Sequence, residues 1–380
     1  MAKDKVKDPY RSLTKIMIVL LVFAVLLASG WFVLDQYNKG KLADAQAKVD
    51  AENEKLIADY EQKIAEQKQQ LNQRQVVEVP TPKSEGWDIL DMSAFPVDNG
   101  VSVTTTRLDA LSGGLMLLNR WHGLPGDFVI AEPEIKSIMD HSNYTVPVSS
   151  RNVKLFPAAT EALQSFIKYA KDEHNLEYYI IREGYRTMAQ QTEYWNKEIQ
   201  RHPNREGDGL IAAARRNVSY PGTSDYQSGF SFHVGIYSRN DSVINTTKFQ
   251  ESKQAELLNE EGWKFGIIYR FPAQGYPTAD TVDKDYATGI DNTRLKMDAY
   301  RYVGIPHSTV MHIKGFCLEE YIDYLVEYPH IQVFNDGTLK HEIFRIPETG
   351  QDQTHSLPAS AKEYSVSTDN MGGLVVALSY

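Results

Sequence analysis

Cysteine is almost absent from this chain, which has Cys317 as its only cysteine among 380 residues. No disulfide can therefore form within the chain. Positive charge is in deficit as well, because the formal net charge is −10 and the folded part has no long basic cluster. Since phosphate binding requires a basic face, we expect no nucleic acid among the partners. Neither a G-x-S-x-G pattern nor a Cys–His signature marks a catalytic nucleophile.

Length and composition indicate a folded unit with accessory segments. A chain of 380 residues is longer than one ordinary domain. Hydrophobic residues make up 42% of it, which is enough to bury a sizeable core. Cys317 stands at the start of an apolar helical segment. We therefore expect its side chain to lie in the core rather than to act as a reactive thiol.

An apolar run without any charge extends from Ile16 to Leu34. At 1.5 Å rise per residue, about 20 residues span the ~30 Å hydrocarbon core of a bilayer. Lysine and arginine are more frequent before the run than after it, so the positive-inside rule places residues 1–15 in the cytoplasm. We therefore expect a single-pass plasma-membrane protein with its C-terminal part outside the cytoplasm. A cleaved signal peptide is the alternative, with small residues at 28–30 as its cleavage site.

Residues 41–74 read as a helical stalk that is rich in Ala, Glu, Lys and Gln and contains no Gly or Pro. Apolar residues recur there every seven positions, which favours a coiled-coil seam and a homo-oligomer. A solvated helix that acts only as a spacer is the equal alternative. Pro80 and Pro82 then exclude a continuing helix, and residues 75–112 read as an extended linker with scattered apolar anchors.

Helix and strand signals alternate from Gly113 to about residue 330. A helix is expected to start at Pro157, because apolar residues follow it at helical spacing. Residues 178–181 and 230–237 read as short strands, and residues 331–380 form a β-rich C-terminal segment. Mixed helices and short strands without a regular βαβ repeat indicate an α+β fold.

Several segments of residues 113–330 resemble the VanY-type D-alanyl-D-alanine carboxypeptidases, and they occur in the order of that family. Residues 184–187 read GYRT, with a glutamine at 191, and resemble the family's G-Y-R-S…Q segment. Residues 221–233 read PGTSDYQSGFSFH, where the family has P-G-x-S-x-H-x-x-G-x-A-x-D. The remaining similar segments are FGIIYRFP at 265–272, YRYVG at 300–304 and CLEEY at 317–321. The resemblance implies a D,D-carboxypeptidase-like fold of the VanY/Hedgehog type.

The resemblance also implies a zinc site, and this chain departs from it at every key position. In the family the two ligand positions of the first motif are His and Asp, but here they are Tyr226 and His233. In the later E-x-W-H motif, Lys296 stands at the position of the glutamate base and Ala299 at that of the last histidine. Catalytic zinc requires three protein ligands and an open site, and the glutamate serves as general base. We therefore expect no metal and no catalysis by these residues.

A rearranged metal site is the alternative. In it Tyr226 and His233 would bind zinc, together with one of His307, His312 and Asp298. The competing interpretation is that Tyr226 and His233 pack and form hydrogen bonds within the former cleft. Tyr194 and Trp195, which follow the arginine of the GYRT segment, are expected in the core.

Groups able to hold a peptide remain at the positions that match the family's substrate-recognition segment. Arg186 matches the arginine from which the family recognises its substrate, and an arginine fork binds a carboxylate through two hydrogen bonds. The other candidate binding residues are Thr187, Gln191, Ser224 and Gln227. The alternative is that Arg186 and Gln191 only satisfy buried polar groups of the fold.

These observations predict a membrane-anchored VanY-like pseudo-peptidase without a cofactor. Its expected partners are a peptidoglycan stem peptide or another envelope protein. An active D-alanyl-D-alanine carboxypeptidase with an altered zinc site is one alternative, and a structural scaffold of an envelope complex is the other.

Overall fold

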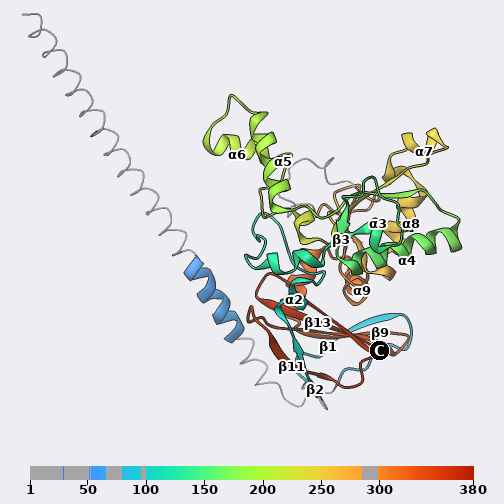
Figure 1. Cartoon of the computed structure of the whole chain (residues 1–380). Coiled ribbons are helices and arrows are strands. Elements are labelled where there is room, and N and C mark those ends of the chain that lie inside the picture. The colour runs from blue at the N-terminus through green and yellow to red at the C-terminus, as the bar shows by residue number, and fades with distance from the viewer. Residues whose placement is uncertain (1–28, 30–50, 52, 66–78, 96–99, 285–297) are drawn as a thin grey trace, which may run out of the picture. The chain divides into compact units, whose positions relative to one another are not determined.

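The computed structural model describes residues 29, 51, 53–65, 79–95, 100–284 and 298–380 (Figure 1). The chain divides into two compact units, residues 1–77 and residues 78–380. In the first unit, residues 53–65 are helical and every one of them is exposed; the rest of the predicted stalk, apart from residue 51, lies outside the described residues. No helix within the described ranges is long and apolar enough to span a bilayer. The predicted span from Ile16 to Leu34 lies outside those ranges, apart from Ser29.

An antiparallel sheet of four strands, in the order β5-β6-β8-β7, forms the centre of residues 113–330, here called the peptidase-like lobe. Its strands are β5 (Tyr179–Glu183), β6 (Ser231–Ile236), β7 (Ile267–Tyr269) and β8 (Ala299–Tyr302). Helix α4 (Pro157–His174) starts at Pro157 as predicted and packs Phe166 against Tyr179 of β5. The rings of Phe232 and Tyr300 stack on this same face of the sheet. His233 of β6 and Ala299 of β8 point to the opposite face.

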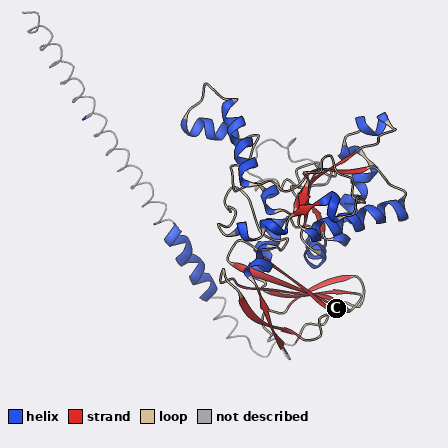
Figure 2. Cartoon of the chain, in the orientation of Figure 1, coloured by secondary structure: helices blue, strands red, loops and turns tan. Residues whose placement is uncertain are grey.

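Most other elements of this lobe lie around the sheet, whereas α5 and α6 project away from it (Figure 2). The helices are α3 (Ile138–His141), α5 (Met188–Gln200), α6 (Gly207–Arg215), α7 (Ser242–Thr246), α8 (Lys253–Glu261), α9 (Ile305–Lys314) and α10 (Leu318–Glu327). The 3-10 turns are η1 (Phe128–Ile130), η2 (Glu132–Glu134), η3 (Asp225–Ser228), η4 (Phe249–Glu251) and η5 (Gly262–Phe265). Strands β3 (Lys136–Ser137) and β4 (Lys154–Leu155) pair with each other.

A second antiparallel sheet combines segments from both ends of the folded unit, in the order β1-β9-β10-β13-β12. Its strands are β1 (Trp87–Asp91), β9 (His330–Asn335), β10 (Thr338–Pro347), β12 (Glu363–Thr368) and β13 (Gly373–Ser379). A separate pair, β2 (Gly100–Thr105) with β11 (Gln353–Pro358), joins the same two ends of the chain. Helix α2 (Arg107–Leu111) follows β2.

The prediction of a linker over residues 75–112 is therefore wrong for residues 87–91 and 100–111. Trp87 pairs with Asn335 and Asp91 with Ile331, so this segment is an edge strand of the second sheet. Sequence alone did not reveal this because the partner strand lies at the far end of the chain. Strand pairing depends on such distant partners as much as on local propensity.

The second sheet shares a hydrophobic core with the peptidase-like lobe. Ile331 and Val375 of the sheet pack with Leu325 of α10 and Val310 of α9, and all four are buried. The predicted β-rich segment 331–380 is therefore not a separate module, because its inner face is covered by helices of residues 113–330.

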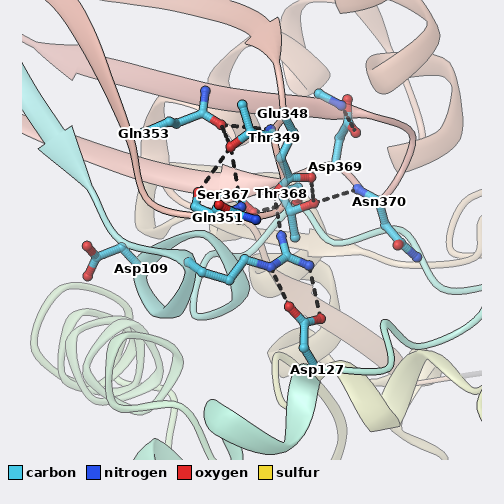
Figure 3. A network of polar contacts seen from close by, with 12 residues as sticks. Asp109, Asp127, Glu348, Thr349, Gln351, Gln353, Ser367, Thr368, Asp369 and Asn370 are labelled. Carbon is cyan, nitrogen blue, oxygen red and sulfur yellow. Dashed lines mark hydrogen bonds and ion pairs between the residues drawn. The ribbon is translucent and has the colours of Figure 1, made fainter.

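A polar network also joins α2 to the end of β10 (Figure 3). Arg107 donates two hydrogen bonds to Asp127, at 2.7 and 3.1 Å, and a further short one to Glu348. Glu348 also accepts a hydrogen bond from the Thr368 hydroxyl at 2.7 Å. One guanidinium thus fixes the chain before η1 to the second sheet.

Candidate functional site

Three adjacent strands place one residue each in a single row across the sheet. Glu183 of β5 pairs with His233 of β6, and His233 pairs with Ala299 of β8. Directly paired residues point to the same face of an antiparallel sheet. Glu183, His233 and Ala299 therefore share the face opposite α4, and Ala299 is buried there.

Asp298, the residue before Ala299, contacts His233 from the start of β8. Its Oδ2 lies 3.6 Å from the His233 Nε2, and its Oδ1 accepts a hydrogen bond from the Gln250 amide at 2.9 Å. The Asp298 backbone has φ +67°, an uncommon conformation for any residue other than glycine. The alternation along a strand would otherwise turn Asp298 to the other face, and this local turn brings its carboxylate to His233.

Tyr226 lies on η3, beneath the guanidinium of Arg186. The Arg186 Cζ is 4.4 Å from the centre of the Tyr226 ring and 5.0 Å from that of Tyr194, so the guanidinium is in cation–π range of both aromatic faces. Burial raises the pKa of the Tyr226 phenol, which therefore stays protonated at neutral pH.

Arg186 already has a carboxylate partner within the site. Its Nε donates to Glu183 Oε1 at 2.6 Å, and its Nη1 donates to Gln191 Oε1 at 3.1 Å. Burial lowers the pKa of Arg186, but the hydrogen bond and ion pair with Glu183 outweigh burial and leave it raised. The guanidinium is thus charged, neutralised by Glu183 and held in one orientation, with 19% of its side chain exposed.

A buried charge network holds η3 in place behind the site. Arg301 of β8 donates to Asp225 Oδ1 at 2.5 Å, and Arg270 lies 3.1 Å from the same oxygen. Arg270 also donates two hydrogen bonds to Glu319 of α10, at 2.9 and 2.8 Å. Burial raises the pKa of Asp225, but Arg270 and Arg301 outweigh it and leave the pKa lowered. Asp225 is next to Tyr226 on η3, so this network holds the main chain that carries the Tyr226 ring.

Comparison with known proteins finds relatives for the part of the chain that carries Glu183, Arg186, Tyr226 and His233. The VanY family model, described as D-alanyl-D-alanine carboxypeptidase, matches residues 152–285. A D-alanyl-D-alanine carboxypeptidase of Enterococcus faecium is 27% identical over 283 residues, which are 74% of this chain and 80% of the relative. The bifunctional D-Ala-D-Ala dipeptidase and D-Ala-D-Ala carboxypeptidase VanXYC of Enterococcus gallinarum is 28% identical over 181 residues, which are 48% of this chain and 84% of the relative.

The chain carries a VanY-type domain. The crystal structure of the vancomycin resistance D,D-dipeptidase VanXYg, in complex with a D-Ala-D-Ala phosphinate analog, supports the same fold. It superposes with a TM-score of 0.53 at 20% identity, over 74% of this chain and 99% of that chain. The predicted resemblance to the VanY family is therefore confirmed, and the family model matches residues 152–285 within the predicted range of 113–330.

The described residues of the VanY-type domain do not fit the three-ligand zinc site that the resemblance implies. Ala299 has no side-chain donor atom, and burial raises the pKa of the Tyr226 phenol, which disfavours the phenolate that would bind a metal. His233 and Asp298 are close, but no third His, Cys, Asp or Glu joins them within the described ranges. Lys296, predicted at the base position, lies outside those ranges.

The two histidines considered as replacement ligands have other partners. His307 is buried and its Nδ1 forms a 2.7 Å hydrogen bond with the Tyr321 hydroxyl. His312 stacks on Trp263, with 4.4 Å between the ring centres. Within the described ranges neither forms a hydrogen bond or ring contact with His233, whereas Asp298, the third candidate, lies beside it.

The predicted binding residues of the VanY-type domain mostly take part in the fold. Thr187 caps α5 in a reciprocal pair of hydrogen bonds with Gln190. Gln191 is buried and donates to the carbonyl of residue 219 at 2.8 Å. Gln227 is buried and accepts from the backbone of residue 222, and Ser224 is buried where η3 begins. Arg186 is thus the predicted residue that combines charge with access to solvent.

Three contributors to the site were not predicted as such. Glu183 immediately precedes the GYRT segment, and its acidic character was the available signal for a partner of Arg186. Tyr194 was expected in the core but is 42% exposed and faces Arg186, whereas Trp195 and Cys317 are buried as predicted. Tyr194 is eight positions after Arg186, yet α5 starts at residue 188 and turns Tyr194 back towards the guanidinium. Gln250 comes from η4 and had no sequence signal.

Proposed function

We propose that the VanY-type domain recognises a peptidoglycan stem peptide at the site that contains Arg186, Glu183 and His233, and that it does so without hydrolysing the peptide. The relatives are D-alanyl-D-alanine carboxypeptidases, which supports a peptidoglycan-related function. The absence of hydrolysis is supported by the row of Glu183, His233 and Ala299 across the sheet. Ala299 has no side-chain atom that can bind a metal. Hydrolysis by a zinc-bound water requires three protein ligands and an open site.

Zinc content and product release test the absence of hydrolysis. The full chain, dialysed against metal-free buffer, is expected to retain much less than one zinc per chain and to release no D-alanine from a pentapeptide that ends in D-alanyl-D-alanine. Stoichiometric zinc together with D-alanine release that a chelator abolishes would show that the chain is an active carboxypeptidase.

Arg186 and Glu183 test the binding half of the proposal. Glu183 competes with a peptide carboxylate for the Arg186 guanidinium, since the two side chains already form an ion pair. Glu183→Gln should therefore tighten binding of the pentapeptide, whereas Arg186→Ala should weaken it by about tenfold, as expected for the loss of a charge-assisted hydrogen bond. Isothermal titration calorimetry measures both.

Arg205→Ala is the matched control, because Arg205 is an exposed arginine between α5 and α6. Its affinity for the pentapeptide should equal that of the unmodified chain. If the unmodified chain fails to bind the pentapeptide at about 1 mM, the recognition proposal is wrong and a scaffold role with a filled cleft is favoured.

We further propose that the domain is held outside the cytoplasm by the apolar run from Ile16 to Leu34. The support for this is the length of the run and the excess of lysine and arginine before it. Fusing a reporter enzyme that is active only outside the cytoplasm after Tyr380 should give activity in cells. A reporter that is active only inside the cytoplasm should then be silent at the same position, and the reverse result would contradict the proposed orientation.

A further inference from the structure

Strand β7 forms one edge of the central sheet and presents unpaired main-chain groups there. β8 is its only strand neighbour among the described residues. The Arg270 N–H donates to the Ala299 carbonyl at 2.9 Å, and the Val303 N–H donates to the Gly266 carbonyl at 2.8 Å. In an antiparallel ladder such pairs alternate with residues whose N–H and C=O point away. The main-chain groups of Tyr269 therefore point outward, and they make no hydrogen bond within the described part of the chain.

A cavity of about 360 Å³ lies along this edge, where a further strand would lie. Its apolar lining includes Trp263, Ile267, Pro277, Val282 and Phe316. Tyr269 lines it as well, so the outward main-chain groups and the apolar walls belong to one site.

The wall opposite β7 is held by hydrogen bonds of its own. The Lys284 N–H donates to the Pro272 carbonyl at 2.7 Å, which closes the loop that follows β7. The Lys284 ammonium also pairs with Glu320 of α10 at 2.7 Å. The space between strand and loop is thus formed before any ligand arrives, and a preformed apolar cavity with few polar groups is typical of a binding site.

We propose that this cavity binds an extended peptide segment, which adds as a strand to the edge of β7 and inserts an apolar side chain between Trp263 and Phe316. An apolar small molecule would fill the walls but leave the N–H and C=O of Tyr269 unpaired. An extended peptide can fill the apolar walls and also pair with the N–H and C=O of Tyr269, because its main chain adds to the edge and its alternate side chains enter the cavity.

Charge adds a preference for a basic peptide. Asp280 and Lys284 both line the cavity, but Lys284 is neutralised by Glu320. Asp280 is exposed and forms no ion pair within the described ranges. A lysine or arginine on the incoming segment would complement this carboxylate. The residues that line this cavity include neither Arg186 nor His233, so the proposal does not depend on what binds at those residues.

A series of synthetic peptides tests the proposal with the full chain. The probes are acetylated, amidated heptapeptides in which threonine alternates with valine, with a lysine at one end and either alanine, leucine or phenylalanine at the centre. Fluorescence anisotropy should show saturable binding that strengthens from alanine to phenylalanine. The same peptides with N-methylated backbone amides keep their side chains but lose main-chain donors, and they should bind at least about tenfold more weakly.

Two exposed valines give matched variants. Val282, which lines the cavity, is 66% exposed, and Val243 on α7 is 72% exposed and lies outside it. Val282→Asp should weaken binding of the phenylalanine peptide by about tenfold, whereas Val243→Asp should leave it unchanged. No saturation by any of the peptides at about 1 mM, or equal binding of the N-methylated series, would overturn the proposal. Equal effects of the two valine variants would place the peptide elsewhere.

Discussion

Two arginines, Arg270 and Arg301, lie fully inside the protein, and Asp225 and Glu319 meet their charges. Arg301 also donates to the main-chain carbonyls of Gly114 and Met116. Buried ions are costly unless they are paired and hydrogen-bonded, and here nearly every donor of the two guanidiniums has a partner. The network ties β8 to η3, to α10 and to the segment that opens the VanY-like region.

Removing one carboxylate from this network should be strongly destabilising. Glu319→Ala leaves the Arg270 guanidinium without its two-hydrogen-bond partner, and breaking a buried pair in this way costs about 3–5 kcal/mol. Urea unfolding of the variant measures this loss. Glu327→Ala is the control, because Glu327 is an exposed glutamate on the same helix, and it should change the free energy of unfolding by less than about 0.5 kcal/mol. Similar effects of the two variants would show that the buried pair is not special.

At the scale of elements, the stalk helix raises a question of assembly. Leu56, Ile57 and Ile64 are all at least 40% exposed on the described helix of residues 53–65. Apolar side chains at heptad spacing are buried when helices associate into a coiled coil. Deleting residues 41–74 should therefore lower the oligomeric mass in sedimentation equilibrium. An unchanged mass would identify the stalk as a spacer.

The elements that sequence predicted well are those with a strong local pattern. Helix α4 was expected from Pro157 and its apolar spacing, and β6 from its run of apolar residues. The β1 and β2 segments were missed because each is short and pairs with residues near the other end of the chain. A linker and an edge strand look alike in local composition, and only the partner distinguishes them.

The candidate site was predictable in its residue types but not in its contacts. The family motifs align His233 and Ala299 with one site, and these two residues pair across β6 and β8. That Glu183 would hold Arg186, and that Asp298 would turn towards His233, depends on strand register and on one unusual backbone angle. A one-residue change of register reverses which side chains face the site, and local sequence does not fix it.

At the scale of the whole molecule, the second sheet is part of the structure that stabilises the VanY-like region. Leu325 and Val310 would lose their buried partners Ile331 and Val375 in a chain that ends after residue 328. Such a truncation should therefore not fold cooperatively, and loss of near-UV circular dichroism measures this. A folded, cooperative fragment of residues 113–328 would contradict the shared core.

Stability should also depend on pH through His307, which is buried, and His341, which is partly buried. Burial lowers the pKa of His307 to about 3 and that of His341 to about 4, from an ordinary value of 6.5. Between pH 6.5 and 4 the unfolded chain thus binds protons that the folded chain does not. The free energy of unfolding should fall as the pH is lowered through this range, by at most about 1.4 kcal/mol per pH unit for each histidine.

Urea unfolding between about pH 7 and pH 4.5 measures this dependence. His341→Gln should make the free energy of unfolding fall less steeply, because one of the two titrating groups is gone. A free energy that stays constant over the range in the unmodified chain would contradict the lowered pKa of both histidines in the folded chain.

The pairing of Trp87 with Asn335 affects how the protein is made. During synthesis β1 leaves the ribosome long before β9 exists, so its edge waits without a strand partner until most of the chain has been translated. Contacts between such distant segments slow folding. The second sheet is complete only when β1 pairs with β9. A chain that is cleaved or stalled before β9 therefore leaves β1 without its partner strand. Such a chain displays bare strand edges, which are templates for aggregation.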